Sequence, residues 1–370
     1  MSSSKDFIPS KYTQFIEKGT FSWSAPSNIA LVKYWGKIEN QLNESGEILT
    51  QIPANPSMSF TLNSCKTETK LSFLKKDNNK EFTFELLFEG KPKEDFKPKI
   101  QKFLERIEVY LPFLKEYHFT IDTQNTFPHS SGIASSASGM AVLAVNLMSL
   151  EKLLNPEMTE EYFNKKASFL ARLGSGSACR SIKGKVVVWG NHQNIDGSSD
   201  LFGVEFPYKI HNNFKNYQDT ILLVDKGEKQ VSSSVGHDLM HGHPFAEKRF
   251  AQAHENLDAL ITIFESGNLS EFIKIVESEA LTLHAMMMTS LPYFILMKPN
   301  TLEIINAIWK FRSETQIPVC FTLDAGANVH VLYPEHVKEE VLTFIKNNLV
   351  GYCQNGHYIC DQIGFGATKI

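Results

Sequence analysis

Small residues and hydroxyl groups are concentrated in one segment, FPHSSGIASSASG, over residues 127–139. Ser135 and Ser136 offer hydroxyls, and Gly139 lacks a Cβ, so that the backbone can approach a bound group closely. The apolar run that follows predicts a buried helix over residues 139–150. The first N–H groups of a helix have no partner within it and attract anions. The segment therefore predicts a phosphate-binding turn, with a serine cap of the helix as the alternative.

Two lysines lie in a largely apolar segment, SAPSNIALVKYWGK, over residues 24–37. Burying the ammonium groups of Lys33 and Lys37 without partners would be costly. Both are therefore predicted to face a cleft and bind anionic groups of a ligand, with structural salt bridges as the alternative. A second segment, RLGSGSACRS over residues 172–181, combines glycines and hydroxyls with Arg180, whose planar guanidinium suits a carboxylate or a phosphate.

An aspartate and three histidines are further candidates for acid–base or metal chemistry. In TLDAGANVHV, Asp324 is followed by small residues that permit a sharp turn and leave its carboxylate accessible, although Asp-Ala-Gly is often only a turn. The segment VSSSVGHDLMHGH, residues 231–243, holds His237, His241 and His243. Their spacing does not match a helical metal site with a nearby carboxylate base, so this segment predicts a loop.

The elements that must position these residues can be read from hydrophobic patterning. Short β-rich runs with polar turns between them predict a mixed sheet in the first third of the chain. Apolar residues at helical spacing over 100–111 and 163–171 predict helices on one face of that sheet. The charge-rich stretches 75–82 and 91–99 predict solvated loops. The predicted strands are TFSWSA, TETKLSFL, FTFELLF, HFTIDTQ and, as a buried strand, GKVVVWG.

The second half predicts helices packed on one face of a small antiparallel sheet, which makes the fold class α+β. The strand-like runs PVCFTL and VHVLY flank the turn that carries Asp324. The polar stretch 191–200 is the best loop near a domain boundary, and the boundary is placed at about residue 210 to give domains 1–210 and 211–370. Helical spacing in this half covers residues 250–264, 302–309 and 337–345.

Composition bounds the function classes. At 370 residues and 42% hydrophobic content the chain can bury a large core. Its net charge of −4, without a basic stripe, argues against a nucleic-acid partner. The five scattered cysteines fit free thiols in a reducing compartment, which predicts a cytoplasmic protein. No apolar segment has the pattern of a signal peptide or the roughly 18 uninterrupted apolar residues of a membrane span, so no membrane partner is predicted.

Together these segments resemble the diphosphomevalonate decarboxylase family, a branch of the galactokinase, homoserine kinase, mevalonate kinase and phosphomevalonate kinase (GHMP) superfamily. The serine-rich turn alone points only to the superfamily, whereas KYWGK, GSGSACRS and DAG together are specific to the decarboxylase branch. The resemblance spans nearly the whole chain. The segments that carry it, in the family's order, are SAPSNIALVKYWGK, IPANPSMSFTL, FPHSSGIASSASG, RLGSGSACRS, FTLDAGANV and DQIGFG.

The resemblance implies a two-domain GHMP-kinase-like fold, with a ribosomal-protein-like mixed sheet and helices at the N-terminus and a ferredoxin-like sandwich at the C-terminus. It implies ATP-dependent decarboxylation of mevalonate 5-diphosphate to isopentenyl diphosphate, CO₂, ADP and phosphate, in the mevalonate route of isoprenoid biosynthesis, with ATP and Mg²⁺ required. A cytoplasmic homodimer is expected because the family commonly forms one.

Site roles carry over position by position. Asp324 would be the general base on the tertiary C3 hydroxyl, Lys33 would sit beside it, and Arg180 would hold the C1 carboxylate. Asn28 would support nucleotide and substrate positioning. Tyr34, Lys37, Ser175 and Ser177 would contact the substrate, particularly its diphosphate. The ATP phosphates would be held by Ser131, Gly132, Ala134, Ser135 and Ser136, with Mg²⁺ bridging phosphate oxygens at Ser136.

Two departures from the family pattern leave alternatives open. The family typically carries an arginine and hydroxyl residues where this chain has Met240 to His243, and an imidazole is a weaker diphosphate partner than a guanidinium. The insertion at residues 39–51 is longer than the family's usual link and is either a lid or a surface loop. The alternatives are a decarboxylase of mevalonate 5-phosphate giving isopentenyl phosphate, a 3-kinase that stops at the phosphorylated alcohol, and a non-catalytic ligand-binding relative.

Overall fold

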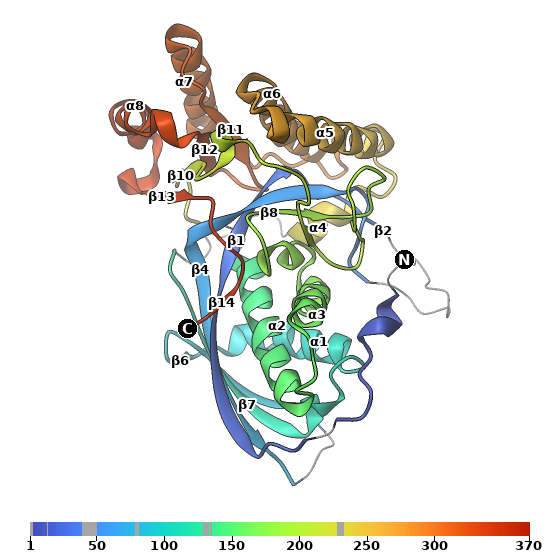
Figure 1. The fold of residues 1–370 in the computed structure, drawn as a ribbon. Coiled ribbons are helices and arrows are strands. Elements are labelled where there is room, and N and C mark those ends of the chain that lie inside the picture. Colours follow the sequence, from blue (N-terminus) through green and yellow to red (C-terminus); the bar gives the residue numbers. More distant parts are fainter. Residues whose placement is uncertain are drawn as a thin grey trace.

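The computed structural model describes residues 3–12, 14–38, 50–77, 81–128, 133, 135–227 and 233–370. Within these residues the chain forms two main sheets, each with its own helices, and the two parts lie one above the other in Figure 1. The predicted α+β class is confirmed. The domain boundary predicted near residue 210 falls in the segment that leads from the larger sheet to the smaller one, and it stays a prediction.

The larger sheet is mixed, as expected. Its order is β14-β1-β4-β7-β5-β6, and β4 also pairs with β8, which pairs with β9. The β5 and β7 strands run parallel, and every other pair in the sheet is antiparallel. The strands are β1 (Lys18–Val32), β4 (Ser57–Lys75), β5 (Thr83–Phe88), β6 (Lys91–Pro92), β7 (Tyr117–Asn125), β8 (Val186–Trp189), β9 (Val204–Glu205) and β14 (Thr368–Lys369); a separate ribbon pairs β2 (Lys37–Ile38) with β3 (Ile52–Pro53).

The β1 strand reaches from the larger sheet into the region between the two parts of the molecule. Its first residues alternate in exposure, but every residue from Ser24 to Val32 is buried. The apolar run at residues 29–32 is typical of a strand covered on both faces, whereas Ser27 and Asn28 are buried with hydrogen bonds to other segments. The end of β1 consequently lies under the helices of the second half (Figure 1).

Three helices cover one face of the larger sheet: α1 (Lys97–Ile107), α2 (Ser135–Leu154) and α3 (Glu160–Gly174). The α2 helix packs on β1, β4 and α3. Of the described helices it alone combines the length and apolar composition of a membrane span, but 83% of its apolar window is buried inside the fold. It is the buried helix that the sequence predicts, although it begins at Ser135 rather than at Gly139.

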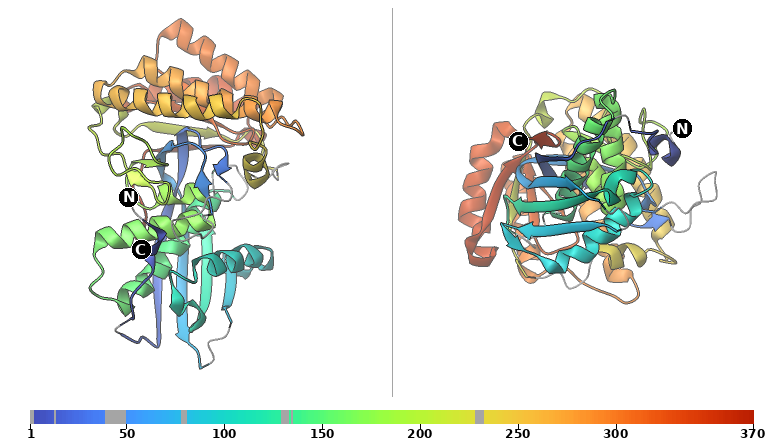
Figure 2. Two further views of the ribbon diagram at one scale, coloured as in Figure 1. Left: turned by 90° about the vertical axis from the view of Figure 1, so that its right-hand side faces the viewer. Right: turned by 90° about the horizontal axis from the view of Figure 1, so that it is seen from below.

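The smaller sheet is antiparallel, with the order β11-β12-β10-β13. Helices cover it, as predicted, and they form the upper layer in both Figure 1 and the left view of Figure 2. The sequence patterns did not identify α6. The strands are β10 (Gln218–Leu222), β11 (Cys320–Leu323), β12 (Val329–Tyr333) and β13 (Tyr358–Gln362), and the helices of this layer are α5 (Ala246–Ser266), α6 (Leu269–Thr289), α7 (Pro299–Thr315) and α8 (Lys338–Phe344). The short helix α4 (Ser233–Asp238) lies below this layer in Figure 1.

One apolar core joins the two parts. It includes Ile29 and Phe60 from the larger sheet, Ile221 from the smaller sheet, and Phe264 and Phe272 from the helices. These side chains are at most 2% exposed. The ends of β1 and β11, which carry candidate site residues, are therefore held against a common core.

Candidate active site

A single cavity of about 670 Å³ receives all the sequence-predicted site residues that the structure describes. Its size is that of a small-molecule site. The wall combines the end of β1, the start of α2, the turn after α3, and the residues after β11. The predicted residues that line it are Asn28, Lys33, Tyr34, Lys37, Ser135, Ser136, Ser175, Ser177, Arg180 and Asp324. Ser131, Gly132 and Ala134 lie outside the described residues, as does most of the insertion at 39–51.

Lys33 and Asp324 meet in this cavity although 291 positions separate them in the sequence. Lys33 follows β1 directly and Asp324 follows β11, so that each part of the molecule contributes one residue. Lys33 Nζ lies 3.2 Å from Asp324 Oδ1, and the two side chains are 2% and 29% exposed. Burial lowers the pKa of Lys33, and the nearby Asp324 carboxylate opposes that shift. The carboxylate thus has a cationic neighbour and remains accessible from the cavity.

The backbone of Asp324 is held by a histidine that the sequence patterns did not identify. His284 Nε2 on α6 lies 3.2 Å from the Asp324 carbonyl oxygen. Because a carbonyl oxygen only accepts, Nε2 carries the proton and donates it. Burial lowers the pKa of His284 to about 4, so the ring is neutral at physiological pH.

Arg180 is fixed by neutral partners. It lies in a 3₁₀ turn, Gly176–Ser181, and is 3% exposed. Its guanidinium donates to the Asn28 amide oxygen (Nε to Oδ1, 3.4 Å) and to the Ser57 hydroxyl. Burial lowers the pKa of Arg180. A buried guanidinium with these partners keeps its positive charge for an anionic ligand group.

Asn28 is engaged by the protein itself. Its amide nitrogen donates to the Ser181 hydroxyl at 2.8 Å and to the Ser177 carbonyl at 3.2 Å, and its oxygen accepts from Arg180. It therefore ties β1 to the turn that carries the arginine. The nucleotide contact predicted for Asn28 stays a prediction.

Tyr34 and the glycine opposite it shape the same wall. The Tyr34 hydroxyl is buried and finds no hydrogen-bond partner among the described residues. Burial raises the pKa of this phenol, so the hydroxyl stays protonated and can donate to an anion. A Cβ at Gly176 would come within 2.9 Å of the Tyr34 oxygen and 2.7 Å of Trp189, which explains the need for glycine there.

Of the three histidines in the 231–243 segment, His237 lines the cavity. The predicted loop is wrong for residues 233–238, which form α4, and this turn of helix directs His237 against the KYWGK segment. His237 Nδ1 accepts from the Gly36 N–H at 3.0 Å, and its ring lies 4.1 Å from the Tyr34 ring. Burial, and then the charges of Lys37 and Arg180, lower the pKa of His237 to about 3. The ring is therefore neutral.

The other two histidines point elsewhere. His241 is exposed, and His243 Nε2 lies 3.1 Å from both the Met286 carbonyl oxygen and the Thr289 hydroxyl. Neither they nor Met240 and Gly242 line the cavity. No group of three or more His, Cys, Asp or Glu side chains suited to a metal occurs among the described residues. Residues 240–243, where the chain departs from the family pattern, therefore lie outside the cavity lining, whereas His237 is part of that lining.

The serines at the start of α2 line another part of the cavity. Ser135 and Ser136 lie in the first turn of this helix, and Ser136 Oγ accepts from Lys99 Nζ at 2.8 Å. Gly139 lies inside α2 and not in a turn, and a Cβ there would meet no atom within 4 Å. Gly139 also lines the cavity, and the predicted close approach of a bound group at this glycine stays a prediction.

Lys99 was missed by the sequence patterns. The charge-rich stretch 91–99 was predicted to be a solvated loop, but Lys97 to Lys99 form the first turn of α1 and Lys99 lines the cavity beside Phe96 and Ile100. The side chain is exposed to the cavity, yet protein atoms surround it and this desolvation lowers the pKa of Lys99. Its position directly before the helical apolar pattern at Ile100 was the available signal.

Comparison with known proteins decides the family. One family model, the diphosphomevalonate decarboxylase-like N-terminal domain, matches residues 25–201, and a second, the mevalonate 5-diphosphate decarboxylase C-terminal domain, matches residues 220–363. The chain belongs to the diphosphomevalonate decarboxylase family. The predicted resemblance is thus confirmed, and with it the class of enzyme, a decarboxylase.

Individual diphosphomevalonate decarboxylases agree over most of the chain. The enzyme from Aspergillus fumigatus is 29% identical over 337 residues, which cover 87% of this chain and 79% of the relative. A solved structure of "MDDEF in complex with MVAPP, AMPPCP and Magnesium" is 27% identical, covers 95% of this chain and 99% of that one, and has a TM-score of 0.77. The mevalonate diphosphate decarboxylase from Staphylococcus aureus is 26% identical, with coverage of 95% and 98% and a TM-score of 0.78. The GHMP fold is confirmed by these similarities.

Proposed function

We propose that this chain catalyses the ATP-dependent decarboxylation of mevalonate 5-diphosphate to isopentenyl diphosphate, CO₂, ADP and phosphate. Family membership and solved relatives bound to MVAPP, AMPPCP and magnesium support the substrates and the metal. The observation that carries the proposal is the convergence of Asp324, Lys33 and Arg180 on one cavity with the serines of α2. An acceptor base, two cations and a helix start are what phosphoryl transfer to a carboxylate-bearing alcohol requires.

Each residue has a separate task in this reaction. Asp324 takes the proton of the tertiary C3 hydroxyl as that oxygen attacks the terminal phosphoryl group of ATP. Lys33, at 3.2 Å, keeps the carboxylate oriented and offsets the negative charge that gathers there. Arg180 holds the C1 carboxylate in line with the C3–O bond. When that bond breaks and phosphate leaves, the electron pair of the C1–C2 bond forms the alkene and CO₂ departs.

The cradle at the start of α2 fits a magnesium nucleotide. The Ser136 hydroxyl and phosphate oxygens are hard donors of the kind Mg²⁺ accepts, and this ion usually takes few ligands from the protein when phosphates are present. When bound, Mg²⁺ neutralises the phosphate charge. The N–H groups of the helix start and Lys99 Nζ, which already reaches Ser136, supply the protein's own positive potential there.

A second candidate substrate is mevalonate 5-phosphate, with isopentenyl phosphate as product. His237 favours it, because a neutral ring stands on the wall near Lys37 and Arg180 and adds no positive charge for a second phosphate. The remaining charges on that wall, Lys37 and Arg180, suit either substrate. Selectivity is therefore the point that the experiment must resolve.

Turnover with each substrate tests the proposal. Purified protein is given Mg²⁺, ATP and either mevalonate 5-diphosphate or 5-phosphate, while ADP and CO₂ are followed together. Equal ADP and CO₂ with the diphosphate is expected. Equal amounts with the monophosphate alone would assign the second candidate, ADP without CO₂ would indicate a 3-kinase, and neither product would indicate a non-catalytic relative.

We further propose that the protein is a cytoplasmic homodimer without nucleic-acid or membrane partners. All five cysteines are free and four of them are buried, which suits a reducing compartment. Sedimentation analysis that gave a monomer at micromolar concentration would overturn the dimer.

A further inference from the structure

Lys33 stands where the pairing of β1 ends. The last β1–β4 pair joins Val32 to Met58, so the next backbone groups have no strand partner. Lys33 is nevertheless 2% exposed. A buried backbone N–H or carbonyl without a partner is costly, so these groups require partners from elsewhere in the molecule.

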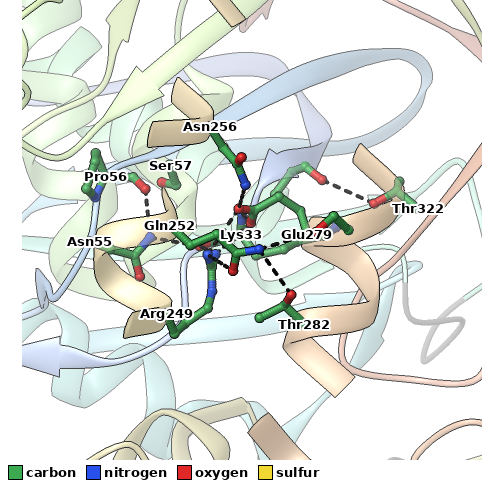
Figure 3. A network of polar contacts seen from close by, with 12 residues as sticks. Lys33, Asn55, Pro56, Ser57, Arg249, Gln252, Asn256, Glu279, Thr282 and Thr322 are labelled. Atoms are coloured by element: carbon green, nitrogen blue, oxygen red, sulfur yellow. Dashed lines mark hydrogen bonds and ion pairs between the residues drawn. The ribbon is translucent and has the colours of Figure 1, made fainter. Parts of the chain in front are cut away.

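Side chains from two helices of the second half supply those partners (Figure 3). The Lys33 N–H donates to Glu279 Oε2 on α6 at 2.8 Å, and the Lys33 carbonyl accepts from Arg249 Nη2 on α5 at 3.0 Å. Asn55 Nδ2 also donates to that carbonyl at 2.9 Å. The N–H and the carbonyl of Lys33, which belong to the two peptide groups on either side of its Cα, are thus each held by a charged side chain.

The two helix residues also bind each other. Arg249 Nη2 lies 2.6 Å from Glu279 Oε2 and Nη1 lies 3.0 Å from Oε1, a bidentate ion pair with both side chains 0% exposed. Asn256 donates to Glu279 Oε1 at 2.6 Å, and Gln252 accepts from Arg249 at 3.3 Å. The planar fork fixes direction as well as distance.

Stability alone gives a poor account of this pair. Removing two charges from water is expensive, and buried ion pairs can often be replaced by apolar residues without loss. An apolar pair, however, could not accept from the N–H of Lys33 and donate to its carbonyl, as Glu279 and Arg249 do. The ion pair is therefore explained by the position it gives to Lys33, whose Nζ must reach Asp324 from the other part of the molecule.

We propose that Arg249 and Glu279 are positioning residues that set the place of Lys33 Nζ beside Asp324. The pair lies on α5 and α6, and α6 also carries His284, which holds the Asp324 backbone. One helix thus fixes both members of the Lys33–Asp324 pair. The catalytic consequence rests on the proposed function, whereas the geometric one does not.

The chain contains a matched control on the same helix. Glu277, two residues before Glu279, forms a bidentate pair with Arg312 of α7 at 2.6 and 3.0 Å. Glu277 does not line the cavity and has no hydrogen bond to Lys33. It also accepts a hydrogen bond from Trp309 Nε1. Glu277→Gln therefore removes a second, less buried bidentate ion pair from the same helix without disturbing the backbone contacts of Lys33.

The kinetic test compares the two helix variants. Glu279→Gln should lower kcat by about 10- to 100-fold, the range for a displacement of about 1 Å at a reacting group, with KM for ATP changed less than about threefold. Glu277→Gln should leave kcat within about twofold. Equal kcat losses in both variants, or a loss in KM alone, would overturn the proposal. If Glu279→Gln folds poorly, Asn256→Ala can replace it in the test. This variant removes one hydrogen bond to Glu279 and should lower kcat by a smaller factor.

A double-mutant cycle separates positioning from general destabilisation. If Glu279 acts through Lys33, then Glu279→Gln should cost less than about twofold in kcat once Lys33→Met is present. Additive losses would indicate an independent effect and overturn the proposal.

A crystal structure of Glu279→Gln tests the geometry without activity. The expected result is a Lys33 Nζ to Asp324 Oδ1 distance beyond ~4 Å, the usual limit for an ion pair. An unchanged distance would overturn the proposal. If the wild-type protein turns over neither substrate, the proposed function fails while this measurement still decides the positioning role.

Discussion

The two walls of the cavity are built differently. At the Lys33–Asp324 wall the protein supplies partners for its own polar groups, because Glu279, Arg249 and Asn55 bind the Lys33 backbone and His284 binds that of Asp324. At the start of α2, Ser136 is exposed and its hydroxyl accepts from Lys99, and both side chains line the cavity. The reacting end is thus set before any ligand binds, and the phosphate end is completed by the ligand.

Because of this difference, substitutions at the two walls should change different kinetic constants. A change at the Lys33–Asp324 wall should lower kcat, because it moves groups that act on the transition state. A change at the α2 wall should mainly raise KM for ATP, because it removes contacts made equally in the ground state. The following predictions test that distinction.

The largest effect is expected at Asp324. Asp324→Asn keeps the shape of the side chain but cannot accept the hydroxyl proton, so kcat should fall by about 10² to 10⁴-fold. ADP and CO₂ release are the measurements, with thermal unfolding as the check on folding. Turnover near that of the wild type would remove Asp324 from the base role.

Arg180→Lys should give the next largest loss. The lysine keeps the charge but loses the planar fork, and kcat/KM for the carboxylate substrate should fall about 10- to 100-fold, the value of one or two charged hydrogen bonds. Arg106→Lys is the control, since Arg106 donates to the Leu173 carbonyl outside the cavity. Similar losses in the two variants would argue against a substrate contact at Arg180.

His237 predicts a dependence of stability on pH. Burial holds its pKa at about 3 in the folded chain, well below the value in an unfolded chain. As pH falls below about 6.5, the unfolded chain binds a proton that the folded chain does not, so the free energy of unfolding decreases, by about 2 kcal/mol between pH 7 and 5. Above that range the stabilisation is complete.

The His237 prediction is checked by denaturant unfolding at a series of pH values. His237→Gln should remove the His237 share of the decrease between pH 7 and 5 and leave the share of His284, whose pKa burial also lowers, whereas His241→Gln, at an exposed position of the same segment, should retain both shares. Identical slopes in the two variants would contradict the buried, neutral state of His237.

The smallest effect is expected at the phosphate wall. Ser136→Ala should raise KM for ATP about 2- to 10-fold with little change in kcat, the value of one hydrogen bond. Ser138→Ala is a matched control on the same helix, because the Ser138 hydroxyl is buried and lies 2.6 Å from that of Thr67. Ser138→Ala should lower the melting temperature and leave KM for ATP unchanged. A raised KM for ATP in Ser138→Ala but not in Ser136→Ala would contradict the proposed difference between the two walls.

The sequence allowed much of the fold to be predicted, because strands and helices of both halves follow period-2 and helical apolar patterns. The α6 helix was missed because its buried face includes polar residues, Glu277, Glu279 and His284, which interrupt the apolar pattern. These are the residues that bind partners far along the chain. At such positions a residue is set by its distant partner and not by the apolar spacing of its own helix, so the pattern in the sequence is lost.

The candidate site was predicted well where side chains are chemically distinctive. Lys33 was chosen because a charge in an apolar segment needs a partner, Arg180 for its planar guanidinium and Asp324 for its place at a sharp turn. All three line one cavity, and their roles stay predictions. Arg249 lies directly before the helical spacing at 250–264 and was not identified, since nothing local shows that its partner is a backbone carbonyl 216 positions earlier. Lys99 was not identified because it is one of several lysines in the charge-rich stretch 91–99, and charge alone does not distinguish it from those that face solvent.

The return of the chain end to the larger sheet has a mechanical consequence. After β13 the chain leaves the smaller sheet: the Gly364 N–H donates to the Thr61 carbonyl, the Ala367 N–H donates to that of Ile182, and β14 pairs with β1. The two sheets are therefore joined by two covalent crossings, residues 206–217 and 363–367, instead of one linker. Two crossings restrict the relative movement of the two sheets more than a single linker would. A label fused to the C-terminus would accordingly move with the larger sheet.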